Sequence, residues 1–320
     1  MYYVGIDLGG TNIAVGVCNE EYKIIARAKS NTNLPRSYGE ICVDMARLTR
    51  EAVAQAGLTM ADVEFIGIGS PGAVNPDTKV VEFANNLGFF NAPIGTLMEE
   101  LTGKEVFIEN DANAAAYGEA VAGAAQGTNS SVTVTLGTGV GGGIVLNGKV
   151  FSGFNHFGAE LGHTVIVRGG RECSCGRAGC WEAYASASAL IYQTKIAMIK
   201  HPESEMWSVV NHDIGAVNGR TAFDAMRLGD RVGKEVVDKY IDYIACGIAN
   251  MVNIFQPEVL CIGGGISKEG ETLLAPIRKV VAEQTYGRYS EKQPRVLAAK
   301  LGDDAGIIGA AFLGRSVKNN

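Results

Sequence analysis

Three cysteines and one histidine stand close together near the middle of the chain and form a potential metal site. Cys173, Cys175 and Cys180 follow His163 along the sequence, and thiolates with an imidazole are ligands that Zn²⁺ prefers. Three cysteines and one histidine fill a tetrahedral shell, so the metal would have a structural rather than a hydrolytic role. The alternative is a group of reduced surface cysteines beside a hydrogen-bonded histidine.

Two glycine-rich segments point to a second kind of chemistry. They read DLGGT at 7–11 and LGTGVGGG at 136–143, and neither fits the P-loop or the dinucleotide-binding fingerprint. Without Cβ atoms, backbone N–H groups can converge on the oxygens of an anion. The alternative is a pair of hairpin turns whose glycines only supply positive φ. The residues that we expect to hold phosphate are Gly9, Gly10, Thr11, Gly137, Thr138 and Gly139.

Asp7 is a carboxylate within an otherwise apolar strand pattern. An ionised side chain is costly there unless it has a partner. A cation, or a water molecule held by one, is such a partner, and Mg²⁺ at a nucleotide keeps several waters and takes only one or two carboxylates. A turn-initiating aspartate at the end of a strand is the alternative.

Asp111 stands where a strand ends and a helix begins, in the sequence Glu109-Asn110-Asp111. One interpretation is an N-cap that satisfies the free amides of the helix. A carboxylate at this position is also well fixed and can accept the proton of a hydroxyl nucleophile. Asn110 beside it can orient such a substrate.

A third glycine group, Gly263, Gly264 and Gly265, follows an apolar strand pattern. Glycines there would let a flat base or a ribose approach the backbone closely. A close strand-to-helix turn explains them equally well.

The elements that must position these residues alternate between strands and helices. Strands are expected at 3–7, 13–18, 23–28, 65–68, 106–109, 132–136, 143–146, 259–262 and 295–299, with the first two joined as an antiparallel hairpin. Helices are expected around 41–52 with Gly57 past its end, at 112–117, at 232–248 before Pro257, at 272–281, and from 305 onward. This order indicates an α/β protein in two halves.

Composition narrows the class of protein. The chain has 320 residues, 47% of them hydrophobic, and a net charge of −6, which excludes a disordered chain and argues against nucleic acid as a partner. Apolar runs are too short to cross a bilayer. The first residues lack the basic start of a signal peptide, so we expect a cytoplasmic protein with no membrane partner.

Taken together and in this order, the motifs resemble the ROK family of sugar kinases and repressors, most closely its bacterial glucokinases. The motifs are DLGGT at 7–11, END at 109–111, LGTGVGGG at 136–143, ELGH at 160–163, CSCGRAGCWE at 173–182 and GDDAG at 302–306. The resemblance implies a two-lobed actin/hexokinase-like (ribonuclease H-like) fold with an interlobe cleft, and a homodimer. The small lobe would comprise 1–115 plus 302–320, and the large lobe 116–301 with the zinc loop.

The resemblance also implies roles. Asp111 would take the proton from the 6-hydroxyl of a hexose, which attacks the γ-phosphate of MgATP. The two glycine-rich turns, with Asp7, would bind the phosphates, and Gly263 to Gly265 the adenosine. Sugar hydroxyls would be held by Gly72, Asn85, Asn110, Glu160, His163 and Glu182.

Glucose is the expected substrate of such a kinase, with N-acetylmannosamine, allose, mannose or fructose as alternatives. A sugar-binding protein without catalysis is a further alternative. The repressors of the family carry an N-terminal helix-turn-helix domain; because the first strand is expected to start at Tyr3, we do not expect such a domain here.

Overall fold

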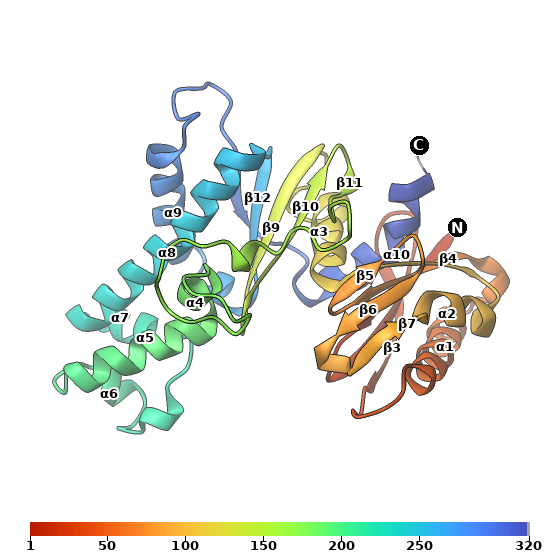
Figure 1. The fold of residues 1–320 in the computed structure, drawn as a ribbon, viewed down its shortest axis with the longest axis horizontal. Helices are drawn as coiled ribbons and strands as arrows, with labels where there is room; N and C mark the ends of the chain where they lie inside the picture. Colours follow the sequence, from red (N-terminus) through yellow and green to blue (C-terminus); the bar gives the residue numbers. More distant parts are fainter. Residues whose placement is uncertain (319–320) are drawn as a thin grey trace. The chain divides into compact units, whose positions relative to one another are not determined.

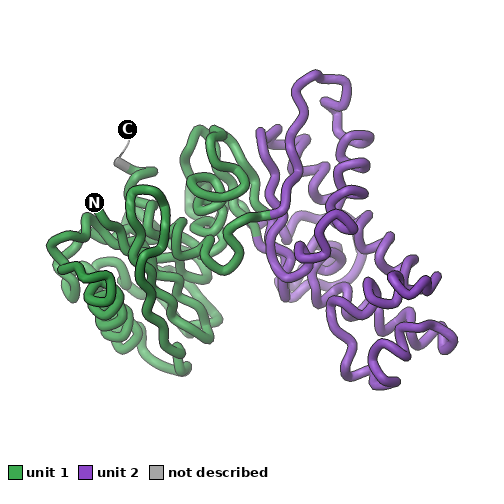
Figure 2. The backbone as a smooth tube through the Cα atoms, turned by 180° about the vertical axis from the view of Figure 1, so that it is seen from behind, with its two compact units in different colours: residues 1–133, 142–159, 299–320 green, residues 134–141, 160–298 purple. Residues whose placement is uncertain are grey.

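The computed structural model describes residues 1–318 and divides into two compact units (Figure 2). The first unit comprises residues 1–133, 142–159 and the chain from 299 onward, and the second comprises 134–141 and 160–298. The lobe boundaries expected at 115/116 and 301/302 stay a prediction, because compact units and functional lobes need not share their boundaries.

The first unit contains a five-stranded sheet in the order β3-β2-β1-β4-β8; Figure 1 labels its strands β3 and β4. The strands are β1 (Tyr2–Leu8), β2 (Asn12–Cys18), β3 (Ile24–Asn31), β4 (Val63–Ser70) and β8 (Glu105–Asn110). The expected antiparallel hairpin of β1 and β2 is confirmed, and β1, β4 and β8 run parallel. In this register Asp7 pairs with Gly69, and Gly69 pairs with Glu109. The strand ends that carry Asp7 and Asn110 therefore lie at one edge of the sheet.

Two pairs of helices cover this sheet. The helices α1 (Tyr38–Gln55) and α2 (Ile94–Thr102) pack on one face, and α3 (Asp111–Ala122) and α10 (Ala305–Lys318) pack on the other. A Cβ at Gly5 would lie 1.9 Å from the carbonyl oxygen of Ile307, and one at Gly67 would lie 1.8 Å from that of Ala310. These two glycines therefore let the C-terminal helix rest directly on β1 and β4, beside α3.

A small antiparallel sheet of β5 (Ala73–Asn75), β6 (Val80–Ala84) and β7 (Phe89–Ala92) also belongs to the first unit. The sequence analysis did not predict it, because its strands are only three to five residues long. It carries Gly72 just before β5 and Asn85 just after β6.

A second five-stranded sheet has the order β11-β10-β9-β12-β13. Its strands are β9 (Ser130–Leu136), β10 (Val140–Leu146), β11 (Lys149–Val150), β12 (Val259–Gly263) and β13 (Arg295–Ala298). The expected strands at 132–136, 143–146 and 259–262 are confirmed as parts of these elements, and the strand expected at 295–299 is confirmed except that β13 ends one residue earlier, at Ala298.

The second unit also holds the remaining α-helices. They are α4 (Glu182–Ala185), α5 (Ala187–Lys200), α6 (Met206–Val209), α7 (Thr221–Arg227), α8 (Arg231–Phe255) and α9 (Glu271–Gln284). Trp181 is fully buried against α8: its indole N–H donates to the Tyr243 carbonyl at 2.8 Å, and a Cβ at Gly247 would lie 2.0 Å from its ring. This contact anchors the segment that follows Cys180.

Short 3₁₀ helices complete the described chain. They are η1 (Met60–Asp62), η2 (Asn85–Leu87), η3 (Leu161–His163), η4 (Ile214–Ala216), η5 (Gly265–Glu269) and η6 (Gly302–Asp304). Across residues 1–318, no helix combines the length and the apolar character needed to cross a membrane.

Candidate active site

The first turn of α3 is fixed by Asn110. Its Oδ1 accepts hydrogen bonds from the amides of Ala112 at 2.9 Å and Asn113 at 3.2 Å, and its Nδ2 donates to the Gly72 carbonyl at 3.1 Å. Asn110 is therefore the N-cap, and the interpretation of Asp111 as the N-cap is wrong. Asp111 is the first residue of the helix, where the positive end of the helix dipole favours a carboxylate.

Glu109 reinforces the same turn from within the protein. Its side chain is 6% exposed, and its Oε1 accepts from the Asn110 amide at 2.9 Å and from Asn113 Nδ2 at 3.0 Å. Burial raises its pKa. The sequence analysis assigned Glu109 no role, although the residue stands directly before Asn110 and Asp111.

Gly72 and Asn85 flank two neighbouring strands of the small sheet, Gly72 directly before β5 and Asn85 directly after β6. Gly72 has a φ of +92°, and a Cβ there would lie 2.1 Å from the Phe83 carbonyl oxygen, so only glycine fits. Asn85 follows β6 two residues after Phe83 and is exposed. The structure thus brings Gly72 into contact with Asn110, and it leaves the Asn85 side chain accessible from solvent.

Two carboxylates, Asp111 and Asp303, act on Asp7 at the edge of the first sheet. Burial raises the pKa of Asp7 to about 6, and the negative charges of Asp111 and Asp303 add to this effect. Burial also raises the pKa of Asp111. Asp303, in η6, was not singled out as a site residue by the sequence analysis. The GDDAG motif before the last helix was the available signal.

The N-terminal turn (residues 8–12) is held by Thr32, which is fully buried. The Thr32 hydroxyl donates to the Gly9 carbonyl at 2.6 Å, and its amide donates to the Thr11 carbonyl at 2.8 Å. The Thr11 side chain is exposed. Neither Gly9 nor Gly10 has a positive φ, so the alternative that these glycines only supply positive φ is wrong.

The second turn (residues 137–140) is held by the start of α5. The Ala187 amide donates to the Gly137 carbonyl at 2.8 Å, and the Ser188 hydroxyl donates to the Thr138 carbonyl at 2.8 Å. Gly137 and Gly139 do not have positive φ either. Thr138 is exposed and, with Gly139, borders a cavity of about 760 Å³ in the second unit.

Gly264 packs against the strand that leads into the second turn. Its φ is +84°, and a Cβ would lie 2.4 Å from the Leu136 carbonyl oxygen. No atom lies within 4 Å of the position of a Cβ at Gly265. The third glycine group therefore adjoins the second turn, and the close approach of two backbones accounts for Gly264.

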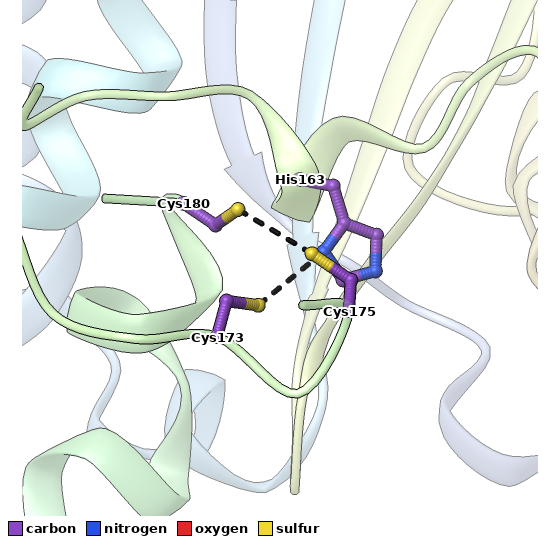
Figure 3. Close-up of side chains that lie close together, drawn as sticks. All are labelled: His163, Cys173, Cys175 and Cys180. Atoms are coloured by element: carbon purple, nitrogen blue, oxygen red, sulfur yellow. Dashed lines mark hydrogen bonds between the residues drawn. The ribbon is translucent and has the colours of Figure 1, made fainter. Parts of the chain in front are cut away.

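The four predicted metal ligands converge in the second unit (Figure 3). Their ligand atoms all lie within 4.8 Å of one another; Cys173 Sγ is 3.6 Å from His163 Nδ1, and Cys175 Sγ is 3.7 Å from Cys180 Sγ. With Zn–S near 2.3 Å and Zn–N near 2.0 Å, a tetrahedron places two sulfurs about 3.8 Å apart and a sulfur and a nitrogen about 3.5 Å apart. The observed distances thus fit a zinc ion, with Nδ1 as the histidine ligand.

The electrostatics around Cys175 also suit a metal. The backbone amide of Arg177 lowers the pKa of the Cys175 thiol, and the thiolate is the form that binds metal. Cys180 is buried and Cys175 is exposed, so the site lies at the surface of its unit.

Glu160 and Glu182 flank these ligands in the sequence. Glu160 is exposed and precedes η3, where the His163 amide donates to its carbonyl at 3.1 Å. Glu182 begins α4, and its Oε2 accepts from the Val140 amide of the second turn at 3.0 Å. The second unit therefore holds Glu160, His163 and Glu182, whereas the first holds Gly72, Asn85, Asn110 and Asp111.

Comparison with known proteins shows which family the chain resembles. The sequence matches the ROK family over residues 3–317. It is 36% identical to a glucokinase of Thermotoga maritima, covering 97% of this chain and 96% of the relative, and 36% identical to a glucokinase of Streptomyces coelicolor, covering 98% and 97%. A xylose repressor of Bacillus subtilis is 30% identical, and 76% of its length is covered.

Solved structures give the same result. A ROK family glucokinase from Streptomyces griseus, in complex with glucose and AMPPNP, has a TM-score of 0.79 and 37% identity over 98% of this chain and 99% of that one. A ROK hexokinase from Thermus thermophilus has a TM-score of 0.82 and 34% identity over the whole of both chains. The expected α/β fold of the actin-like sugar kinases is confirmed, and the chain belongs to the ROK family.

Proposed function

We propose that the protein is an ATP-dependent hexokinase that transfers the γ-phosphate of ATP to the 6-hydroxyl of glucose. The observation that carries this proposal is the fixed Asn110–Asp111 turn at the start of α3, in a chain that matches glucokinases over nearly its whole length. The S. griseus relative binds glucose and the ATP analogue AMPPNP. Those two ligands are what the transfer requires.

Asp111 is the proposed catalytic base. As the sugar oxygen attacks the γ-phosphorus, the 6-hydroxyl proton passes to the Asp111 carboxylate, the bond to the bridging oxygen breaks, and ADP leaves. The raised pKa of Asp111 makes it a better proton acceptor than an ordinary aspartate. Asn110 and Glu109 hold the turn, so that the carboxylate needs little reorganisation during transfer.

The phosphates are proposed to lie against the two glycine-rich turns. The exposed hydroxyls of Thr11 and Thr138 are available as donors, and the backbone N–H groups of Gly9, Gly10, Gly137 and Gly139 are proposed to face the phosphate oxygens. When bound with the nucleotide, Mg²⁺ neutralises charge that develops on those oxygens. Asp7 is proposed to face this ion through water. Gly263 to Gly265 are proposed to lie along the adenosine.

The sugar is proposed to be held by Gly72, Asn85, Asn110, Glu160, His163 and Glu182. Carboxylates and amides suit this task because each can bond two neighbouring hydroxyls. With His163 bound to zinc through Nδ1, its Nε2–H is left to face a sugar oxygen. The zinc, held by His163, Cys173, Cys175 and Cys180, would fix the loop that presents Glu182.

A sugar-responsive repressor is the second candidate function, because xylose repressors match at 30–31% identity. The glucokinases match at 35–36% and are covered over 96–97% of their length, against 76–77% for the repressors. The kinase is therefore favoured. A homodimer and a cytoplasmic location remain predictions of the sequence.

The test is release of ADP by the purified protein with MgATP and a panel of sugars: glucose, mannose, fructose, allose, N-acetylglucosamine and N-acetylmannosamine. We expect the highest kcat/KM for glucose. A higher value for another hexose would keep the mechanism and change the substrate. Sugar binding without ADP release from any hexose would overturn the kinase and favour a binding protein.

A further inference from the structure

One carboxylate joins the metal-binding segment to the second turn. Glu182 Oε2 accepts from the Val140 amide at 3.0 Å. The other oxygen, Oε1, accepts from the Ser174 hydroxyl at 3.3 Å and lies 3.7 Å from Cys173 Sγ. Glu182 therefore touches a predicted metal ligand with one oxygen and the glycine-rich turn with the other.

Two glycines allow close contact between the second turn and the metal-binding segment; we call this contact region the junction. A Cβ at Gly139 would lie 2.3 Å from Glu182 Oε2, so the turn rests directly on the carboxylate. A Cβ at Gly162, next to His163, would lie 2.1 Å from the Val140 carbonyl oxygen. The metal-binding segment thus contacts Val140 at two places: at Gly162, beside the first ligand His163, and at Glu182, two residues after the last ligand Cys180.

The position of Glu182 depends on the loop between Cys173 and Cys180. Ser174 lies between two ligands, and apart from the contact with Glu182 it is exposed. Backbone hydrogen bonds hold the main chain of this loop, from the Cys173 amide to the Arg177 carbonyl at 2.8 Å and from the Gly179 amide to the Arg171 carbonyl at 2.7 Å. The ligand side chains, by contrast, meet through sulfur contacts of 3.6 and 3.7 Å, which are weak. A metal would therefore fix the side chain of Cys173, which lies against Glu182, more firmly than these contacts do.

We propose that Glu182 couples the metal site to nucleotide binding, as a positioning residue for the second turn. With metal bound, the loop holds Glu182 against the Val140 amide and keeps the turn in the shape that receives phosphate. Without metal, the turn loses this support. The inference rests on the proposed function in one respect, namely that the second turn binds phosphate.

Thermodynamic linkage makes the proposal quantitative. If metal raises the affinity for the nucleotide by a given factor, the nucleotide must raise the affinity for metal by the same factor. Coupling between two sites is typically about 5–150-fold, and we expect about 10-fold here because one charge-assisted hydrogen bond carries it.

The experiment measures both sides of this linkage without sugar, so that a sugar-binding role of Glu182 does not enter. Calorimetry gives the Kd of MgAMPPNP for zinc-loaded and for chelator-treated protein. A chromophoric chelator gives the zinc affinity with and without MgAMPPNP. Both ratios should be about 10 in the wild type.

Glu182→Ala should bind zinc, because all four ligands remain, and both ratios should fall to about 1. Ser174→Ala is a milder variant that leaves the Val140 contact intact, and it should reduce the ratios by several-fold. Glu172→Ala removes an exposed carboxylate directly before Cys173 that does not contact Glu182 or Val140 in the hydrogen bonds described above, and it should keep the wild-type ratios.

The outcomes separate the two proposals. Zinc-loaded wild type that binds MgAMPPNP with the same Kd as the metal-free protein overturns the coupling and leaves the kinase intact. Full coupling in Glu182→Ala overturns the role of this residue. Zinc-loaded wild type that binds no MgAMPPNP overturns the proposed function itself. Should Glu182→Ala fail to fold, unchanged ratios in the exposed Ser174→Ala variant overturn the proposal.

Discussion

Replacing Glu119 by glutamine should destabilise the first unit strongly, although the two side chains have nearly the same volume. Glu119 is 1% exposed near the end of α3. Its Oε1 accepts from the amides of Lys300 at 2.9 Å and Leu301 at 2.7 Å, and its Oε2 accepts from Ala124 at 2.8 Å and Lys300 at 3.1 Å. One carboxylate thus ties the end of α3 to the segment that leads into α10.

The expected loss in the free energy of unfolding follows from the hydrogen bonds that a glutamine cannot accept. A glutamine has one acceptor oxygen, so its NH₂ group must face the Ala124 amide or the Leu301 amide, whichever way the side chain is turned. Losing a hydrogen bond to a charged acceptor costs about 1.5–3 kcal/mol, and the buried amide left without a partner costs about 1–3 kcal/mol more. The neutral side chain avoids the desolvation of a carboxylate, which offsets part of this loss. We expect a net loss of about 3 kcal/mol.

The assay is urea unfolding of wild type and Glu119→Gln, followed by circular dichroism. An exposed carboxylate in α9 provides the control: Glu283→Gln should change the free energy of unfolding by less than about 0.5 kcal/mol. A loss below about 1 kcal/mol in Glu119→Gln would refute the reasoning, because it would mean that the amides are satisfied without the second oxygen.

A second variant, at Gly123, tests the hydrogen bonds of the Glu119 carboxylate without changing Glu119 itself. A Cβ at Gly123 would lie 2.0 Å from Glu119 Oε2, and the φ of −107° and ψ of −142° of Gly123 lie outside the regions that alanine favours. Gly123→Ala should therefore destabilise both by displacing the carboxylate and by straining the backbone. The double variant should lose less than the sum of the single losses, because both changes break the same hydrogen bonds.

Three further predictions concern the site. Asp111→Asn should lower kcat by at least ~10²-fold while glucose still binds; near-normal turnover in a coupled assay would remove Asp111 from its role. Metal analysis of protein purified without chelator should find about one zinc per chain, and Cys175→Ser should lose it; retention of full metal would contradict the assigned ligand set. Asp7→Asn should stabilise the nucleotide-free protein by up to about 3 kcal/mol at pH 8, because burial raises the pKa of Asp7 to about 6. As the pH rises from 4 to 6, Asp7 ionises in the unfolded chain before it ionises in the folded protein, so the stability of the wild type falls across that window. The stability advantage of Asp7→Asn therefore vanishes near pH 4. Equal urea midpoints of variant and wild type at pH 8 would refute this prediction.

Much of the fold could be predicted because its signals are local. Hydrophobic runs bounded by glycine located β1, β2, β4 and β12, and a regular apolar stripe located α8, whose end at Phe255 stands just before Pro257 as expected. The small sheet of β5, β6 and β7 escaped prediction because short strands carry too few alternations. The short helices between 201 and 227 also lack a repeating apolar face.

The sequence allowed us to predict which residue types form the candidate site, but less of how these residues are arranged in space. The four metal ligands are near one another in sequence, so spacing alone grouped them. The influence of Asp303 on Asp7 was not foreseeable, because 296 positions separate them and only the return of α10 brings them together. The choice between Asn110 and Asp111 as the N-cap also needs backbone geometry, since both residue types cap helices well.

The glycines show why a local sequence pattern gives an incomplete reason for the residues that it contains. The sequence offers positive φ and phosphate binding as reasons for Gly139, yet its φ is not positive, and the carboxylate of Glu182 lies where its Cβ would be. Gly5 and Gly67 are likewise required by the close approach of α10. In each case the constraint comes from a segment distant in sequence, and a local pattern cannot report it. A glycine-rich motif therefore marks where backbones or ligands come close, and only the fold decides which of the two it is at each position.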